Sequence, residues 1–137
     1  MRRFKYANFF EELEEDCPPA HARERARHAF HFVFDPSSDD RNFKVYATRR
    51  PAQFEADPCC SQCGLSMFTT EQLARAKFAK VAEKSKNIRK LLGDHLALLV
   101  LTEDHGIQTN ATAEGHFDLH EYHDVNLASV ATVIGPL

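Results

Sequence analysis

The chain has 137 residues, 43% of them hydrophobic and 27% charged, a composition typical of one globular domain with a single core. Its formal net charge of -3 argues against a protein that coats nucleic acid. A membrane-spanning helix needs ~20 apolar residues, and the run Leu96 to Leu101 is far shorter. We therefore expect a single cytoplasmic α+β domain over residues 1–137, without a membrane partner.

Residues 1–28 indicate a helical N-terminal segment that precedes a sheet with a packed helix over 29–137. Phe9, Phe10 and Leu13 share one side of a predicted helix over residues 4–15. The pair Pro18-Pro19 ends that helix, because neither proline can donate a backbone hydrogen bond. Residues 20–27 predict one or two further helical turns.

A β-hairpin is expected next. Residues 30–34 are aromatic and β-branched, which favours a strand, and the polar residues 35–42 favour a turn. Residues 43–47 alternate in polarity and predict the returning strand. Residues 48–63 then show no periodicity, and a loop of this length in a compact domain is usually functional or pinned by some other group.

The second half of the chain predicts one main helix between buried strands. Residues 65–68 predict a strand, and Thr69 with Gln72 predicts the capping box of a helix. Residues 96–101 are continuously aliphatic, as in a central strand; a homodimer core is the alternative. Further strands are predicted over residues 116–122 and 130–134. About six strands and two or three helices, without a βαβ rhythm, indicate a curved, largely antiparallel sheet.

Three of the four cysteines lie within residues 59–63. Adjacent cysteines are poorly placed for ordinary disulfides, and a cytoplasmic protein favours reduced thiols. We therefore expect free thiols or metal ligands.

Zinc is the first candidate ligand. Cys60 and Cys63 form a Cys-x-x-Cys pair, and thiolate and imidazole are the ligands that zinc prefers. His116 and His120 share a face whether their segment is strand or helix, so they could complete the site; His120 with His123 is the alternative pair. Under this hypothesis the protein is a non-enzymatic binding module whose loop is held by zinc.

A nucleotide is the second candidate ligand. The run Gly64-Leu65-Ser66-Met67-Phe68, followed by Thr70-Glu71 and Leu73-Ala74, resembles part of the ADP-ribosyltransferase-like fold over about residues 64–101. The resemblance implies cleavage of NAD. His31 (or Arg49) would hold a ribose or pyrophosphate, Ser66 would lie near the nicotinamide ribose, and Glu121 (or Glu114) would stabilise an oxocarbenium-like transition state. Further cofactor-binding positions would be Arg49, Gly64 and Tyr46.

A third hypothesis is metal-dependent hydrolysis by His116, Asp118 and His120, with a partner such as His28, His31 or His105. The basic stretch 77–90 predicts a solvated helix face, with a phosphate-facing patch as the alternative. P-loop, Rossmann, zincin and α/β-hydrolase motifs are absent from the sequence. The zinc and nucleotide hypotheses both require the cysteine-rich loop and the histidine-rich segment to meet.

Overall fold

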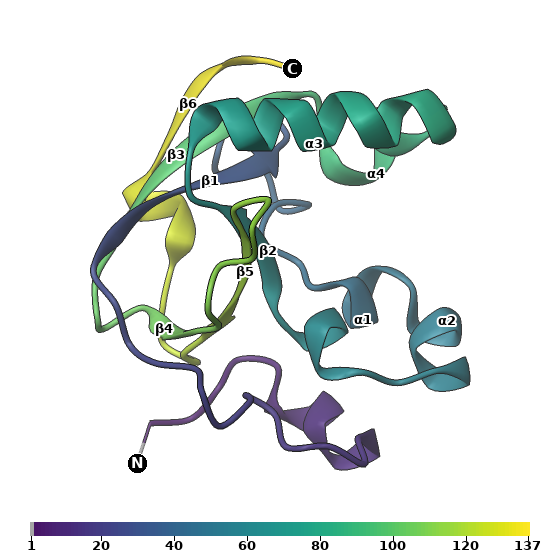
Figure 1. Cartoon of the computed structure of the whole chain (residues 1–137), viewed down its shortest axis with the longest axis vertical. Coiled ribbons are helices and arrows are strands. Elements are labelled where there is room, and N and C mark those ends of the chain that lie inside the picture. The colour runs from purple at the N-terminus through teal and green to yellow at the C-terminus, as the bar shows by residue number, and fades with distance from the viewer. Residues whose placement is uncertain (1) are drawn as a thin grey trace.

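The computed structural model describes residues 2–137 and confirms the α+β class. Six antiparallel strands form one open sheet in the order β4-β5-β2-β1-β3-β6 (Figure 1). The strands are β1 (Arg27–Val33), β2 (Leu65–Phe68), β3 (His95–Leu101), β4 (Gly106–Gln108), β5 (His116–Glu121) and β6 (Ala131–Pro136). The α-helices are α1 (Tyr46–Arg49), α2 (Pro51–Ala56), α3 (Glu71–Lys84) and α4 (Ile88–Leu92), and 3₁₀ turns cover Ala7–Glu12, Cys60–Cys63 and Leu127–Val130.

The sheet is weakly joined between its two central strands. β1 pairs with β3 over seven positions but with β2 only at Phe30 and Phe68. The carbonyl oxygen of Ser66 accepts instead from Nδ1 of His31, at 2.6 Å. The His31 side chain thus occupies a backbone carbonyl that could otherwise accept a hydrogen bond from a neighbouring strand. Beyond the single pair of Phe30 with Phe68, β1 and β2 separate.

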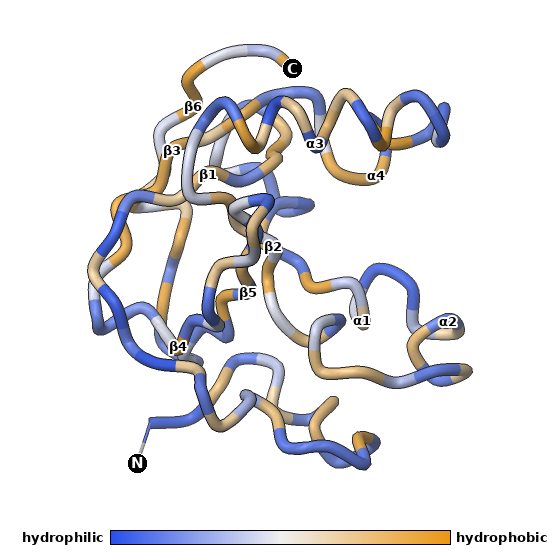
Figure 2. The backbone as a smooth tube through the Cα atoms, viewed as in Figure 1, coloured by the Kyte–Doolittle hydropathy of each residue, from blue (hydrophilic) through white to orange (hydrophobic). Residues whose placement is uncertain are grey.

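Two clusters of buried side chains hold the sheet. The larger one includes Met67, Leu99, Phe117 and Leu119, each no more than 1% exposed. The smaller cluster lies under α3, where Phe78 packs edge-on against Phe32. Hydrophobic and hydrophilic residues alternate along α3 in Figure 2, as expected for a helix with one buried side.

The predicted hairpin is wrong. Oδ1 of Asn42 accepts from the Phe34 amide, and Nδ2 of Asn42 donates to the Phe34 carbonyl. The polar groups at the end of β1 are therefore satisfied by a side chain rather than by a returning strand. Phe43 adopts a positive φ of 59°, and the chain enters α1, which buries Ala47 by a helical turn.

The structure differs from several other local predictions. The N-terminal helix is reduced to the 3₁₀ turn Ala7–Glu12, and residues 20–27 form no helix. Helix α3 is capped one residue later than predicted, since Oγ1 of Thr70 accepts from the Leu73 amide. The loop predicted over residues 48–63 contains helix α2 and a 3₁₀ turn. Among the described residues, none of the helices is long and apolar enough to cross a bilayer.

Candidate functional site

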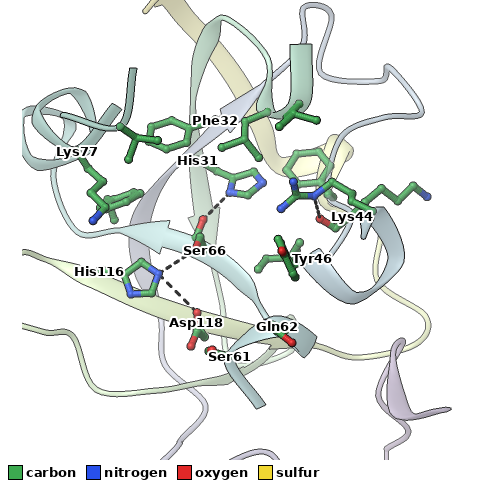
Figure 3. Close-up of a pocket in the computed structure, with 18 of the residues that line it drawn as sticks. His31, Phe32, Lys44, Tyr46, Ser61, Gln62, Ser66, Lys77, His116 and Asp118 are labelled. Atoms are coloured by element: carbon green, nitrogen blue, oxygen red, sulfur yellow. Dashed lines mark hydrogen bonds and ion pairs between the residues drawn. The ribbon is translucent and has the colours of Figure 1, made fainter. Parts of the chain in front are cut away.

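A cleft of about 740 Å³ opens where β1 and β2 separate. Its walls come from both of these strands, from β5, from the segment leading into α1, and from α3 and α4 (Figure 3). Its volume lies within the range of roughly 300–1,000 Å³ typical of small-molecule sites. The aromatic side chains that line it are Phe32, Phe34, Phe43, Tyr46 and Phe68.

A line of polar side chains crosses the cleft (Figure 3). Oγ of Ser66 lies 2.8 Å from Nε2 of His116, which in turn lies 3.5 Å from Oδ1 of Asp118. Ser66 and Asp118 are directly opposed in the pairing of β2 with β5, and His116 is opposed to Phe68. The even-numbered residues of β5 share one side of the strand, so the alternation itself brings this set together.

His31 is held in one orientation at the mouth of the strand separation. Its ring stacks on Phe43, with centroids 5.4 Å apart, and Nδ1 contacts the Ser66 carbonyl. Burial lowers the pKa of His31 to about 4, against the opposing effect of that carbonyl. The imidazole is therefore neutral near pH 7. Because a carbonyl can only accept, Nδ1 carries the proton and Nε2 is an acceptor.

The cleft carries more basic than acidic side chains. Arg41, Lys44, Arg49 and Lys77 line it, against Glu114 and Asp118. Burial lowers the pKa of Arg49, and within residues 2–137 no carboxylate forms a salt bridge with it. A partly desolvated guanidinium of this kind favours an anion.

Asp118 is the buried acid of the cleft, at 9% exposure. Burial raises its pKa to about 6. Ser66, His116 and Asp118 do not form a Ser-His-Asp triad, because Ser66 and Asp118 both approach Nε2 of His116, whereas a triad aspartate bonds Nδ1.

The structure brings most of the expected NAD-binding residues into this cleft. The residues that line it are His31, Tyr46, Arg49, Gly64, Glu114 and Ser66. Glu121 lies elsewhere: it is 2% exposed, and its Oε2 pairs with Nζ of Lys5 at 3.0 Å. Glu121 is an odd-numbered residue of β5 and so points away from the face that carries Asp118.

The four expected zinc ligands are not brought together. Cys60 and His120 meet, with Sγ 3.8 Å from Nε2, but His116 contacts Ser66 and the buried Cys63 thiol contacts the Cys59 carbonyl. The third member of the group is instead Cys17. The ligand atoms of Cys17, Cys60 and His120 all lie within 4.8 Å of one another.

Cys17 and Cys60 form a disulfide, contrary to the expectation of free thiols or metal ligands. The two residues are 43 positions apart, so no local spacing pattern indicated their contact. Cys59 and Cys63 are free, and burial raises the pKa of Cys63 to about 12. The disulfide joins the N-terminal segment to the loop before β2.

His120 is buried beside this disulfide, at 2% exposure. Burial lowers its pKa to about 4, and Nδ1 has no hydrogen-bond partner in the described part of the chain. A second cavity of about 420 Å³ is lined by Cys60 and His120, together with Glu15 and His21. Asp118 lines both cavities, so the cysteine-rich loop and the histidine-rich strand do meet.

The three residues of the hydrolysis hypothesis all line the second cavity, but their ligand atoms do not form a close group among the described residues. His116 and Asp118 lie in the cleft, whereas His120 faces Cys60. Of the proposed partners, His28 is exposed, and His105 contacts Thr102 in the turn after β3. Only His31 shares the cleft.

Sequence reasoning missed Phe43 and Lys44 as cleft residues because they were assigned to a hairpin. Lys77 belongs to the basic stretch 77–90. Because it is adjacent to the buried Phe78 on α3, its place in the sequence does not show whether its side chain faces the cleft. In comparisons with known proteins, no family model, no curated protein and no solved structure matches the chain.

Proposed function

We propose that the cleft between β1 and β2 binds a nucleotide, with NAD as its preferred ligand, and that it promotes cleavage of the bond between nicotinamide and ribose. One observation carries the proposal. A single cavity of about 740 Å³ combines aromatic rings, an excess of basic side chains and a buried carboxylate. These are the groups that stack on bases, pair with phosphates and stabilise a positive charge.

The basic side chains that line the cleft would bind the phosphates. Arg49 and Lys77 come from α1 and α3 and line the same cleft, so each could contact a phosphate group of a bound nucleotide. Tyr46 and the stacked pair of His31 and Phe43 supply flat surfaces for a base or nicotinamide ring. The unprotonated Nε2 of His31 can accept a hydrogen bond from a ribose hydroxyl.

The reaction needs a negative group near the anomeric carbon, because departure of nicotinamide leaves an oxocarbenium-like ribose. We assign this role to Asp118 rather than to Glu121, since Asp118 lies in the cleft beside Ser66 and His116. Ser66 would position the acceptor or water through its hydrogen bond with His116.

The test compares binding with turnover. NAD binding is measured by calorimetry, and nicotinamide release by chromatography. We expect Asp118→Asn to retain NAD binding but to lower release by at least about 100-fold, the usual cost of removing one transition-state contact. Glu103→Gln, in the exposed turn after β3, is the matched control and should leave both unchanged.

Arg49→Met and Lys77→Met should each weaken NAD binding, because each removes a positive charge from the lining of the cleft. If the wild-type protein binds no NAD but binds another nucleotide, the cleft assignment stands and the NAD assignment fails. If it binds no nucleotide, the proposal fails altogether.

A second candidate function is a non-enzymatic module whose loop is held by zinc. The convergence of Cys17, Cys60 and His120 favours it. Elemental analysis of protein purified without added metal, paired with the NAD calorimetry, separates the two functions. One zinc per chain without NAD binding supports the module, and NAD binding without metal supports the enzyme.

A further inference from the structure

The group formed by Cys17, Cys60 and His120 has the ligand types and the burial of a zinc site. Nε2 of His120 lies 3.8 Å from Sγ of Cys60. Zinc bound to one sulfur and one nitrogen holds those two atoms about 3.6 Å apart in a tetrahedral site. The existing separation is therefore close to the one that the metal requires.

A second observation points to a ligand at this place. His120 is 2% exposed, and its Nδ1 has no hydrogen-bond partner among the described residues. Its Nε2 makes a weak contact with sulfur, and the Cys63 backbone opposes the lowering of its pKa by burial. Buried polar groups are normally fully paired, because an unpaired one costs free energy. An imidazole left in this state is suited to a partner that the oxidised protein does not provide.

The disulfide explains why that partner is excluded. Both sulfurs of the group are committed to their mutual bond, and zinc binds thiolates rather than disulfide sulfur. We propose that reduction of the Cys17–Cys60 bond turns the group into a zinc site with Cys17, Cys60 and His120 as its three protein ligands. The fourth position would open onto the second cavity, which Cys60 and His120 both line.

The disulfide is replaced by a zinc site in two steps. A dithiol reductant gives two electrons and two protons to the disulfide, which becomes two thiols while the reductant becomes a disulfide. Zinc then binds, and the two thiols release their protons to solvent. The covalent link between the N-terminal segment and the loop before β2 is thereby replaced by a metal link between the same residues.

This inference deepens the second candidate function and is independent of the nucleotide-binding cleft. It differs from the ligand set expected from sequence, since it uses Cys17 and omits Cys63 and His116. The distinction matters for the test, because zinc held by Cys63 or His116 would support a zinc-held loop while contradicting this site.

The experiment uses the full chain, oxidised or reduced with a dithiol that is then removed under anaerobic conditions. Zinc is titrated against a chromogenic chelator, and cobalt is substituted to read thiolate coordination from its absorption. We expect one tight zinc per reduced chain, none in the oxidised chain, and cobalt charge-transfer bands from two thiolates. Circular dichroism on each sample reports whether the fold is kept.

Variants identify the ligands. In the reduced state, Cys17→Ser and His120→Gln should each weaken zinc binding by at least about 100-fold, since each removes one of three ligands. Cys59→Ser and Cys63→Ser are the matched controls and should bind zinc like the wild type. Tight zinc binding by the oxidised chain, no binding by the reduced chain (folded or unfolded), or loss of binding in Cys63→Ser would each overturn the proposal.

Discussion

The two faces of β5 are both largely buried, yet they carry opposite kinds of side chain. The odd-numbered face buries Phe117 and Leu119 in the main core and pairs Glu121 with Lys5. The even-numbered face carries His116, Asp118 and His120, and each of these lines a cavity. Burial alone therefore does not separate the face that packs in the core from the face that carries the candidate site.

The difference lies in what each face meets. Glu121 is buried against a cation, so its charge is compensated within the fold. Asp118 makes only a long contact with His116, and His120 meets a disulfide that offers it almost no hydrogen bonding. Oε1 of Glu121 also has no hydrogen-bond partner among the described residues, so a missing partner alone does not mark a candidate site. The distinguishing features of Asp118 and His120 are a position beside a cavity and the lack of a paired cation within residues 2–137.

The largest effect is expected from breaking the ion pair on the odd-numbered face. Lys5→Met leaves the Glu121 carboxylate buried without its cation, and should lower the free energy of unfolding by about 3 kcal/mol. Urea unfolding measures this loss. Arg2→Met, which removes exposed ion pairs with Asp124 and Asp104, is the control and should lower stability much less. Similar losses for the two variants would contradict the distinction drawn between the faces.

An intermediate effect is expected where the two cavities adjoin. A Cβ on Gly64 would lie 3.0 Å from both Cβ of Asp118 and Cε1 of His120. Gly64→Ala should therefore displace both side chains and cost about 1–3 kcal/mol of stability. It should also weaken NAD binding by the cleft and zinc binding by the reduced chain. If only one ligand is affected, the two sites share less of β5 than the structure indicates.

The last effect concerns pH. The folded state lowers the pKa of His31 from 6.5 to about 4, so the unfolded chain binds the extra proton first as the pH falls. The neutral imidazole's contribution to stability is complete above about pH 6.5 and is lost progressively toward about pH 4.

His31→Asn removes this titration. The difference in unfolding free energy between wild type and His31→Asn should therefore narrow as the pH falls through that window. Urea unfolding of both proteins at a series of pH values measures it, and using the difference cancels the titration of other groups such as Asp118. A constant difference across the series would contradict a His31 that is neutral in the folded protein.

Sequence periodicity predicted the regular parts of the fold. The strands at residues 65–68 and 116–121, the main helix and the turn ended by Gly93 follow from alternation, capping and glycine, which are local signals. The predicted hairpin failed because Asn42 satisfies the end of β1 through its side chain, an interaction that no hydrophobic pattern encodes.

The residues of the candidate site were also predicted only in part from the sequence. Alternation predicted that His116 and Asp118 share one face, and Ser66 was identified through the resemblance to the ADP-ribosyltransferase-like fold. Their grouping with Ser66 depends on strand register, and the contact of Cys17 with Cys60 depends on chain packing over 43 positions. Neither the partner of a strand nor the approach of two distant segments can be read from local spacing.

The single pair between Phe30 and Phe68 gives the sheet an internal seam. On one side β6, β3 and β1 form a ladder of their own, and on the other β2, β5 and β4 form a second ladder. Widening the cleft thus breaks few backbone hydrogen bonds, and amide exchange near the seam should be faster than at the middle of β3. A ligand that contacts His31 on one ladder and Asp118 on the other would hold the two ladders together across that seam.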